Sequence, residues 1–375
     1  MSADLVVFGE DWGCHPSSTQ HLVRHLLRDR RALWVNSIGP RRPRLTMSDF
    51  HRLVGKGVSM LRGRERQEGA SGAHTPIILE PKALPFPGNP VAGFVNRHFL
   101  GRAINTSMRS AGIRHPVLWA SLPTAVDAVG TLDERAVVYY CGDDFSSLAG
   151  VDHEAVSALE WKLAERADLI LAASPILADK FPSAKTQLIP HGVDLDLFQT
   201  PAPRPTDLPS GRPVAGFYGS ISDWVDVELL AGAAQRLPEW SFVLVGPVRT
   251  NIAPLKVLGN VHLLGQRPHE ALPGYVQNWN VSLLPFRDTP QIRACNPLKL
   301  REYLAAGRPV VATDFPALDG YRDLVRVVDD SRSFASSLCD ALEEGAPHVA
   351  ERRDRVRSES WQARAARVSE LLEVL

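Results

Sequence analysis

The sequence predicts an α/β fold with two doubly wound domains, and three observations lead to this prediction. Short apolar runs alternate with helical periods through almost all of the 375 residues. The runs are nearly continuous, which is typical of strands that are buried on both faces of a parallel sheet. A proline-rich stretch without periodicity, residues 200–213, interrupts the alternation and predicts a linker between two such sheets.

The elements follow one another in a regular order on both sides of this linker. A strand at the N-terminus leads into a helix from about Ser18, and we assign residues 1–199 to the first domain. The alternation restarts in a second domain, residues 214–357, and an amphipathic helix, residues 358–375, ends the chain. The expected strands are DLVVFG, ALWVNS, VLWAS, AVVYYC, DLILAAS and QLIP, and then VAGFYG, SFVLVG, VHLLG, NVSLLPF and PVVAT.

Composition and charge exclude several classes of function. Forty-two basic and 42 acidic side chains give a formal net charge of zero, so the overall charge gives no indication of nucleic-acid binding. The four cysteines are far apart and form no C-x-x-C pair, which argues against a zinc site or a disulfide scaffold. We see no signal peptide, and no uncharged run reaches the roughly 18 residues that span a bilayer. We therefore expect a cytoplasmic protein.

Residues 41–66 form a strongly basic segment within this neutral chain. Eight arginines or lysines stand there against two acidic residues. On a helix, Phe50 would lie on an apolar face, with Arg52, Lys56 and Arg62 elsewhere around it. This pattern is typical of an interfacial helix on anionic lipid, and it predicts a peripheral protein on the inner face of the cytoplasmic membrane. The alternative is a basic helix on the first domain with its charges in water.

Ligands of open parallel sheets bind at the carboxyl ends of the strands, so the loops there hold the first candidates. In the first domain, Asp143 and Asp144 follow the strand AVVYYC; one could act as a base, or both could only cap a turn. The pair does not suit a metal, because no other carboxylate or histidine stands at ligand spacing. The loop after the first strand offers acceptor-side candidates, of which the histidine could instead be a packing residue: Asp11, His15, Ser17 and Ser18.

The second domain offers cations and a glycine at the same rim. Gly219 and Ser220 follow its first strand and would allow a ligand close to the backbone, although a glycine there is common in α/β proteins. Arg287, Arg293 and Lys299 come from the later segment LLPFRDTPQIRACNPLK.

The helix that begins near Asn296 carries two charges on one face. Asn296 is a good N-cap, Pro297 suits the first helical position, and Gly307 should end the helix. Lys299 and Glu302 are three residues apart and therefore point the same way. The alternative to a binding role is an ion pair on a solvated face.

These motifs resemble those of the GT-B glycosyltransferases, in which two Rossmann-like domains hold a nucleotide sugar against the C-terminal domain. IPHGVDLDLF is similar to the segment that closes their N-terminal domain, GFYGSISDW to the start of the donor domain, and NPLKLREYLAAGRPVVAT to its nucleotide-binding helix and strand. The final helix is similar to the segment that crosses back onto the N-terminal domain. The chain looks most like bacterial surface-polysaccharide transferases, of the teichuronic-acid and xanthan glucuronosyltransferase types.

The resemblance implies roles for the charged face of this helix. Glu302 would accept hydrogen bonds from the ribose hydroxyls, and Lys299 would neutralise phosphate charge with the N-terminus of its own helix. The expected donor-binding residues are Gly219, Ser220, Arg287, Arg293, Asn296, Lys299 and Glu302. No metal and no cofactor is expected, since the nucleotide sugar is a substrate.

The chain also departs from the family pattern. Many retaining members carry a second glutamate eight residues before the ribose-binding one, where this chain has Ala294, and an Arg and a Lys where it has GSISDW. A retaining mechanism therefore loses support. An inverting mechanism needs a general base on the acceptor side, for which Asp143 or Asp144 is placed at a suitable strand end, and Asp11 or His15 comes next.

The sequence thus predicts a glycosyltransferase that moves a sugar from a UDP-sugar to a lipid-linked or polysaccharide acceptor in cell-surface polysaccharide synthesis. Two rival functions remain open. A UDP-sugar 2-epimerase shares the fold and would turn over the donor without an acceptor. A degenerate sugar-nucleotide-binding scaffold would explain the loss at Ala294.

Overall fold

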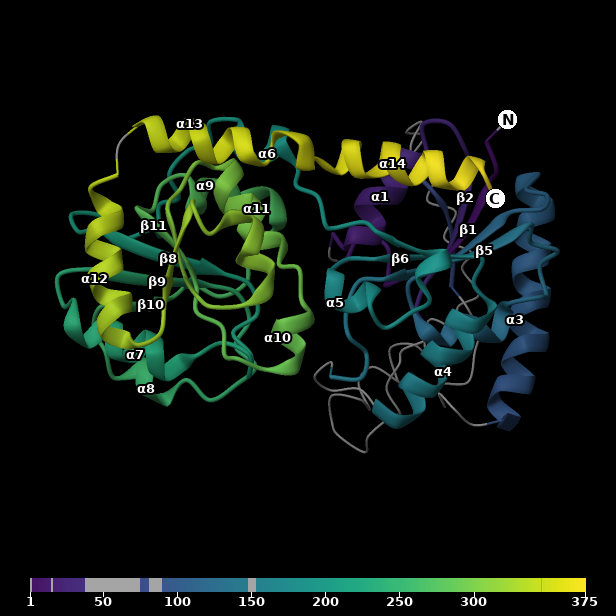
Figure 1. Cartoon of the computed structure of the whole chain (residues 1–375), viewed down its shortest axis with the longest axis horizontal. Coiled ribbons are helices and arrows are strands. Elements are labelled where there is room, and N and C mark those ends of the chain that lie inside the picture. Colours follow the sequence, from purple (N-terminus) through teal and green to yellow (C-terminus); the bar gives the residue numbers. More distant parts are fainter. Residues whose placement is uncertain (1, 15, 38–74, 81–89, 148–152, 345) are drawn as a thin grey trace. The chain divides into compact units, whose positions relative to one another are not determined.

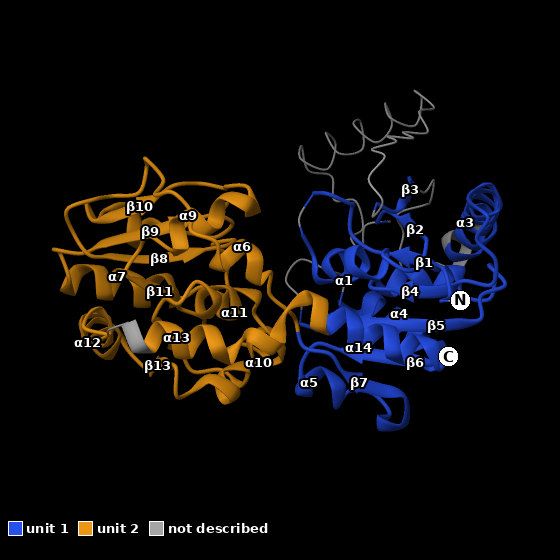
Figure 2. Cartoon of the chain, turned by 90° about the horizontal axis from the view of Figure 1, so that it is seen from above, with its two compact units in different colours: residues 1–190, 364–375 blue, residues 191–363 orange. Residues whose placement is uncertain are grey.

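A computed structural model describes residues 2–14, 16–37, 75–80, 90–147, 153–344 and 346–375, and it divides the chain into two compact units (Figures 1 and 2). Unit 1 comprises residues 1–190 and 364–375, and unit 2 comprises residues 191–363. Each unit is an α/β structure around one parallel sheet, which confirms the predicted fold class. The chain passes from unit 1 to unit 2 at residues 190 and 191, before the predicted linker at 200–213.

Unit 1 is built on a seven-stranded parallel sheet in the order β3-β2-β1-β4-β5-β6-β7. The five inner strands are buried along their whole length, whereas the edge strands β3 and β7 are partly exposed. Continuous apolar runs therefore lie where both faces of the sheet are covered. The strands are β1 Leu5–Phe8, β2 Ala32–Val35, β3 Ile77–Leu79, β4 Val117–Ala120, β5 Ala136–Cys141, β6 Leu169–Ala172 and β7 Thr186–Leu188.

Two helices of unit 1, α1 and α5, begin at a serine that caps them. Ser17 caps the first helix, because its side chain accepts a hydrogen bond from the backbone N–H of Gln20. Ser174 does the same for α5 through the N–H of Leu177. The helices are α1 Ser18–Leu26, α3 Pro90–Ala111, α4 His153–Arg166 and α5 Pro175–Ala178, with 3-10 turns at Pro123–Ala128 and Ser183–Lys185.

Unit 2 contains a six-stranded parallel sheet in the order β10-β9-β8-β11-β12-β13. Its core gathers bulky side chains that are almost fully buried, among them Trp240, Trp279 and Tyr303. A core of this size is what allows the second unit to fold around its own sheet. The strands are β8 Val214–Tyr218, β9 Ser241–Val245, β10 Val261–Leu263, β11 Val281–Leu284, β12 Val310–Thr313 and β13 Val325–Val328.

The helices of unit 2 match the predicted alternation, with one early difference in α11. The predicted helix near Asn296 begins at Leu298 and ends at Ala305, and Gly307 follows with a left-handed φ of 81°, as predicted for a C-terminal glycine. The helices are α6 Leu195–Gln199, α7 Val227–Arg236, α8 Ala253–Lys256, α9 Leu272–Val276, α10 Pro290–Ala294, α11 Leu298–Ala305, α12 Ser331–Leu342 and α13 Ala346–Arg355, with 3-10 turns at His269–Ala271, Pro316–Tyr321 and Arg357–Glu359.

The proline-rich segment 200–213 packs on unit 2. The Ala202 N–H donates to Oε1 of Gln277 at 2.8 Å, and the Arg204 guanidinium donates to the carbonyl of Asn278 at 3.0 Å. The segment that the sequence predicts as a linker is therefore bonded to the surface of the second unit.

The last helix, α14 (Trp361–Glu373), starts in unit 2 and ends in unit 1. Arg30 of unit 1 donates to the hydroxyl of Ser369 at 2.5 Å and lies 3.3 Å from the carboxylate of Glu373. The last residues of the chain thus belong to the first unit.

Candidate active site

Lys299 lies against the glycine that follows β8. Gly219 has a φ of 127°, and a Cβ at this position would clash with the Lys299 side chain, with Nζ only 2.8 Å away. Burial lowers the pKa of Lys299, against the opposing attraction of Glu302. Within the described residues, no hydrogen bond or ion pair reaches the ammonium group, which lies 5.9 Å from the centre of the Phe217 ring. Lys299 thus places a cation, without a hydrogen bond or ion pair in the described structure, beside the backbone at the end of β8.

Glu302 lies one turn further along α11 and is 7% exposed. The Tyr218 hydroxyl donates to Oε2, and Nε2 of His269 lies 3.2 Å from Oε1. Burial lowers the pKa of His269, but the hydrogen bond and charge of Glu302, together with the charges of Glu270 and Asp194, raise it above its usual range. A carboxylate has about four lone-pair sites, so Glu302 could still accept from a ligand. The alternative of a solvated Lys299–Glu302 ion pair is wrong, because Glu302 is buried and bonded elsewhere.

Asn296 does not cap α11, contrary to the prediction. The N-cap is Pro297, whose extended backbone carries no side-chain cap. Oδ1 of Asn296 accepts a hydrogen bond from Nη1 of Arg301 at 2.5 Å, and the same guanidinium donates to Glu359 at 2.5 Å. The side chain is turned to this buried cation, so the first-turn N–H groups of α11 are left without a side-chain acceptor.

The two predicted arginines on this rim differ in their partners. Arg293 is exposed and makes two hydrogen bonds of 2.6 Å to Asp288, and these bonds raise its pKa. Arg287 is exposed, and its backbone N–H donates to the carbonyl of Trp224 at 2.8 Å. Arg293 is therefore tied to Asp288, whereas no described residue forms a hydrogen bond or ion pair with the guanidinium of Arg287.

Ser220 belongs to the loop that follows Gly219. Its hydroxyl lies 2.6 Å from that of Ser222, and the next residue, Ile221, pairs with Val248 in a parallel bridge. The loop is thus held in place beside Lys299 by its own hydrogen bonds.

Asp144 is fully engaged within unit 1. Its carboxylate accepts from the hydroxyls of Ser146 and Ser147 at 2.7 Å each and lies 2.8 Å from Nζ of Lys180. Burial would raise the pKa of Asp144, but the bonds to Lys180 and the two serines hold it at about 2. Lys180 also lies 3.1 Å from buried Glu160. Asp144 therefore anchors the turn after β5.

Asp143, its neighbour, is free of such partners. No hydrogen bond or ion pair reaches its carboxylate within the part of the chain that the structure describes, and the residue keeps an exposed face. The protein packed around it, and then the carboxylates of Glu10 and Asp144, raise its pKa to about 6. A carboxylate that is accessible and unusually basic is chemically suited to general-base work.

The loop after β1 supplies mainly structural residues. Oδ1 of Asp11 accepts from the backbone N–H and the hydroxyl of Ser37 at 3.2 and 3.1 Å. Ser17 caps α1 and buried Ser18 bonds the hydroxyl of Tyr140. His15 lies outside the described residues. Asp11 is thus less free than Asp143 to take a proton.

The predicted membrane-contact residues, Phe50, Arg52, Lys56 and Arg62, lie outside the described residues. Among the helices that are described, none is long and apolar enough to cross a membrane. The described side chains also include no group of three or more His, Cys, Asp or Glu that could hold a metal ion.

Comparison with known proteins gives this arrangement its context. Residues 212–344 match the model of the family described as Glycosyl transferases group 1. The matched residues lie within unit 2. A protein of Bacillus subtilis (strain 168), described as a candidate teichuronic acid biosynthesis glycosyltransferase, TuaH, is 31% identical over 221 residues. The match covers 53% of this chain and 56% of the length of TuaH.

Solved structures resemble the chain over both units. Anabaena HepE in complex with UDP has a TM-score of 0.68 at 14% identity, covering 99% of this chain and 100% of that chain. Sucrose-phosphate synthase from Thermosynechococcus elongatus has a TM-score of 0.70 at 18% identity, covering 99% of this chain and 98% of that chain. Likeness at this level shows the fold, which is GT-B, as the sequence predicts.

Unit 2 also contains functional candidates that sequence reasoning missed. Tyr218 ends a buried strand and His269 begins a 3-10 turn, and nothing in their spacing links either to Glu302. The same holds in unit 1 for Lys180, which contacts both Asp144 and Glu160. Only the fold brings these residues together, because they come from different strands, helices and turns.

Proposed function

We propose that this protein is a glycosyltransferase that moves a sugar from a UDP-sugar to a lipid-linked or polysaccharide acceptor in cell-surface polysaccharide synthesis. The observation that carries the proposal is that α11 holds both Lys299, which lies against Gly219, and a buried, oriented Glu302, within residues that match the group 1 family model. One helix can thereby hold the phosphate and the ribose ends of a nucleoside diphosphate. The UDP complex of HepE supports a UDP-sugar as the donor. The name of TuaH supports a role in polysaccharide synthesis.

The transfer itself exchanges one bond for another. The acceptor hydroxyl would give its proton to Asp143 as its oxygen bonds to the anomeric carbon, while the bond from that carbon to the diphosphate breaks. The raised pKa of Asp143 supports this role, because a stronger base takes the proton more readily. With attack opposite to the leaving group, the configuration of the sugar inverts.

The leaving diphosphate gains charge as its bond to the sugar breaks. Lys299 and the uncapped first-turn N–H groups of α11 are fixed charges and dipoles of the sign that this group needs. We propose on this basis that the reaction requires no metal ion. Addition of a chelator to the purified enzyme should leave the rate unchanged.

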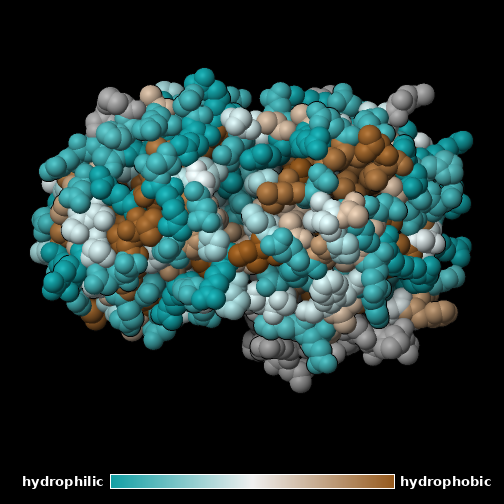
Figure 3. Space-filling model, in the orientation of Figure 1, coloured by the Kyte–Doolittle hydropathy of each residue, from teal (hydrophilic) through white to brown (hydrophobic). Residues whose placement is uncertain are grey.

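An acceptor in the membrane would require the protein to reach a lipid surface, and helix α3 has the chemistry for this. Phe94 and Phe99 are 75% and 61% exposed, and Arg102 and Arg109 are exposed on the same helix, which contains no acidic residue. Figure 3 shows apolar patches within the mainly hydrophilic surface of unit 1. Exposed aromatic rings among cations suit an anionic bilayer surface.

A scaffold without catalytic activity is the second candidate, and Ala294 favours it. This residue is 3% exposed and occupies the position of the glutamate that many retaining members use. Release of UDP from a panel of UDP-sugars, with and without a membrane extract, separates the candidates. A transferase releases UDP only with an acceptor, a 2-epimerase converts the donor without one, and a scaffold binds UDP but turns nothing over.

A further inference from the structure

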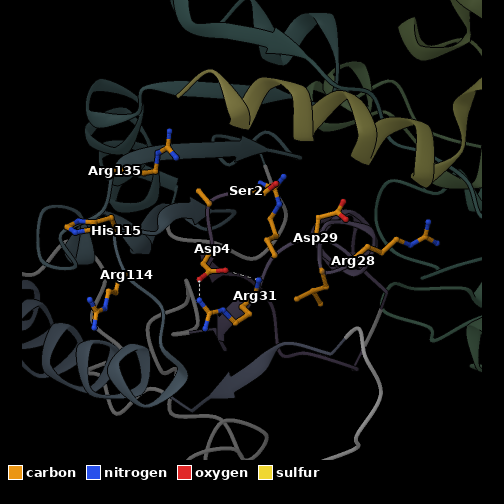
Figure 4. Close-up of a pocket in the computed structure, with 11 residues that line it drawn as sticks. Ser2, Asp4, Arg28, Asp29, Arg31, Arg114, His115 and Arg135 are labelled. Carbon is orange, nitrogen blue, oxygen red and sulfur yellow. Dashed lines mark hydrogen bonds and ion pairs between the residues drawn. The ribbon is translucent and has the colours of Figure 1, made fainter.

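A hollow of about 1000 Å³ opens in unit 1 at the amino ends of the strands (Figure 4). Arg31 directly precedes β2, Arg114 and His115 stand just before β4, and Arg135 directly precedes β5. Asp143 follows the carboxyl end of β5, so the hollow lies at the opposite edge of the sheet from the candidate base. The hollow therefore belongs to neither part of the proposed active site.

Positive charge dominates the lining of this hollow. Five arginines and a histidine line it, against the two carboxylates of Asp4 and Asp29. Asp4 is already neutralised, because Nη2 of Arg31 lies 2.6 Å from its Oδ2. Arg31 also donates to the carbonyls of Ala111 and Gly112 at 2.9 Å each, where it closes the C-terminus of α3. This pair is structural, and it leaves the remaining arginines with little opposing charge.

Two of those arginines are free to bind. Arg114 and Arg135 are exposed, and neither side chain has a hydrogen bond or ion pair within the described residues. Figure 4 shows both on the same side of the hollow as His115, whereas Arg28 points away on the other side. His115 has a left-handed backbone, with a φ of 44°, and its Nδ1 lies 3.1 Å from Asp133, so its loop is held in a defined shape.

Arg30 adds a buried charge behind this surface. Its side chain is 1% exposed, and Nε and Nη1 have no hydrogen-bond partner in the described structure. Burial lowers the pKa of Arg30, and Glu373 only partly opposes this. An incompletely neutralised guanidinium in a poorly solvated place strengthens the positive potential nearby.

We propose that this arginine hollow, defined by Arg30, Arg31, Arg114 and Arg135, binds a soluble ligand that carries two or more phosphate or carboxylate groups. The guanidinium fork matches both kinds of oxyanion, and the volume exceeds what one phosphate would fill. Its described lining offers no aromatic side chain besides His115 and no large exposed apolar one, since Leu27 is buried. Stacked bases and bilayer insertion both need such groups.

Calorimetric titration with tripolyphosphate at low ionic strength tests the proposal. The double variant Arg114→Gln/Arg135→Gln should bind more weakly by about a hundredfold or more, because two charge-assisted contacts are lost and each is worth at least about tenfold. The matched control, Arg236→Gln/Arg332→Gln at two exposed arginines of unit 2, removes the same charge outside the hollow and should stay within about twofold of the wild type. Thermal unfolding of both variants checks that they fold.

Three further measurements test whether the ligand is a soluble polyanion and whether it binds in the arginine hollow. Tripolyphosphate affinity should survive Lys299→Ala, because the donor site would otherwise be the binding place. Inorganic phosphate should bind more weakly than tripolyphosphate, and phosphatidylglycerol vesicles should not compete with it. Equal losses in the two double variants, no binding by the wild type, or displacement by vesicles would each overturn the proposal. UDP binding is measured in the same proteins, so a failure here is distinguishable from a failure of the proposed transferase.

Discussion

His269 and Glu302 are joined through Nε2 and Oε1 at 3.2 Å, although 33 residues separate them in the chain. The Tyr218 hydroxyl donates to the other oxygen of the same carboxylate. Two donors from different elements therefore fix the rotamer of the residue that is expected to bind ribose. A carboxylate held in this way presents its remaining lone pairs in one direction only.

The first prediction concerns this orientation. Tyr218→Phe and His269→Asn should each weaken UDP binding by about tenfold, because a net hydrogen bond is worth about 1 kcal/mol and a misdirected carboxylate adds to the loss. Each variant should also lose part of its preference for UDP over 2′-deoxy-UDP in calorimetry. Tyr275→Phe, which removes a hydroxyl bonded to Asp207 instead, serves as the control. Unchanged preference in both variants would mean that Glu302 does not contact the ribose.

The second prediction concerns the phosphate end of the donor. Lys299→Ala should weaken UDP binding by about tenfold to a hundredfold, since a hydrogen bond to a charged group is worth roughly 1.5–3 kcal/mol. Uridine, which lacks the diphosphate, should bind both proteins alike. Lys256→Ala, at an exposed lysine of the same unit, should change neither affinity. If uridine and UDP lose the same factor, the lysine supports the fold rather than the phosphate.

The sequence analysis predicts the fold well because the signal there is local. Continuous apolar runs such as VLWA and VSLL mark buried parallel strands, and the structure places both in the interior of a sheet. The placing of Lys299 and Glu302 on one face of a helix could be predicted for the same reason, since it follows from helical spacing, whereas their donor-binding roles rest on the family resemblance and stay predictions.

Partners that are distant in sequence explain what could not be predicted. Asparagine is a residue type that favours the N-cap position. In the structure, however, the side-chain oxygen of Asn296 accepts a hydrogen bond from Arg301, because the buried guanidinium needs acceptors. The different environments of Asp143 and Asp144 also follow from Lys180, 36 residues away from the second aspartate. A single sequence gives no information on such pairings.

A third prediction concerns membrane contact through α3. Phe94→Ser/Phe99→Ser should reduce co-sedimentation with phosphatidylglycerol vesicles severalfold, because two exposed rings no longer enter the bilayer surface. Salt should weaken the wild-type interaction, since exposed charges are screened beyond about 10 Å at 0.1 M. Val257→Ser removes an exposed apolar side chain from unit 2 and should have no effect. Wild-type protein that stays in the supernatant at low salt would rule out this surface.

A fourth prediction separates the structural aspartate from its neighbour. Asp144→Asn should lower the free energy of unfolding by roughly 1–2 kcal/mol at pH 7, because the ion pair with Lys180 is lost. The folded-state pKa of Asp144 is lowered to about 2, so its contribution is present above about pH 4 and is lost as the pH falls towards 2. Urea denaturation at pH 7 and pH 3 should therefore show a smaller difference at the lower pH. Asp323→Asn removes an exposed ion pair with Arg355 and should lower the free energy of unfolding by less than Asp144→Asn does at pH 7.

The last prediction concerns Asp143 as the general base. Its pKa is raised to about 6, so the carboxylate should lose its basic form as the pH falls below that value, and the turnover rate should fall with it. Asp143→Asn should reduce turnover by about 10²–10⁴-fold and abolish this acidic limb, while UDP affinity and thermal stability change little. Asp143→Glu, which restores a carboxylate, should recover part of the rate. Near-wild-type turnover of Asp143→Asn on the authentic acceptor would show that Asp143 is not the general base. Asp11 and His15 would then be the next candidates.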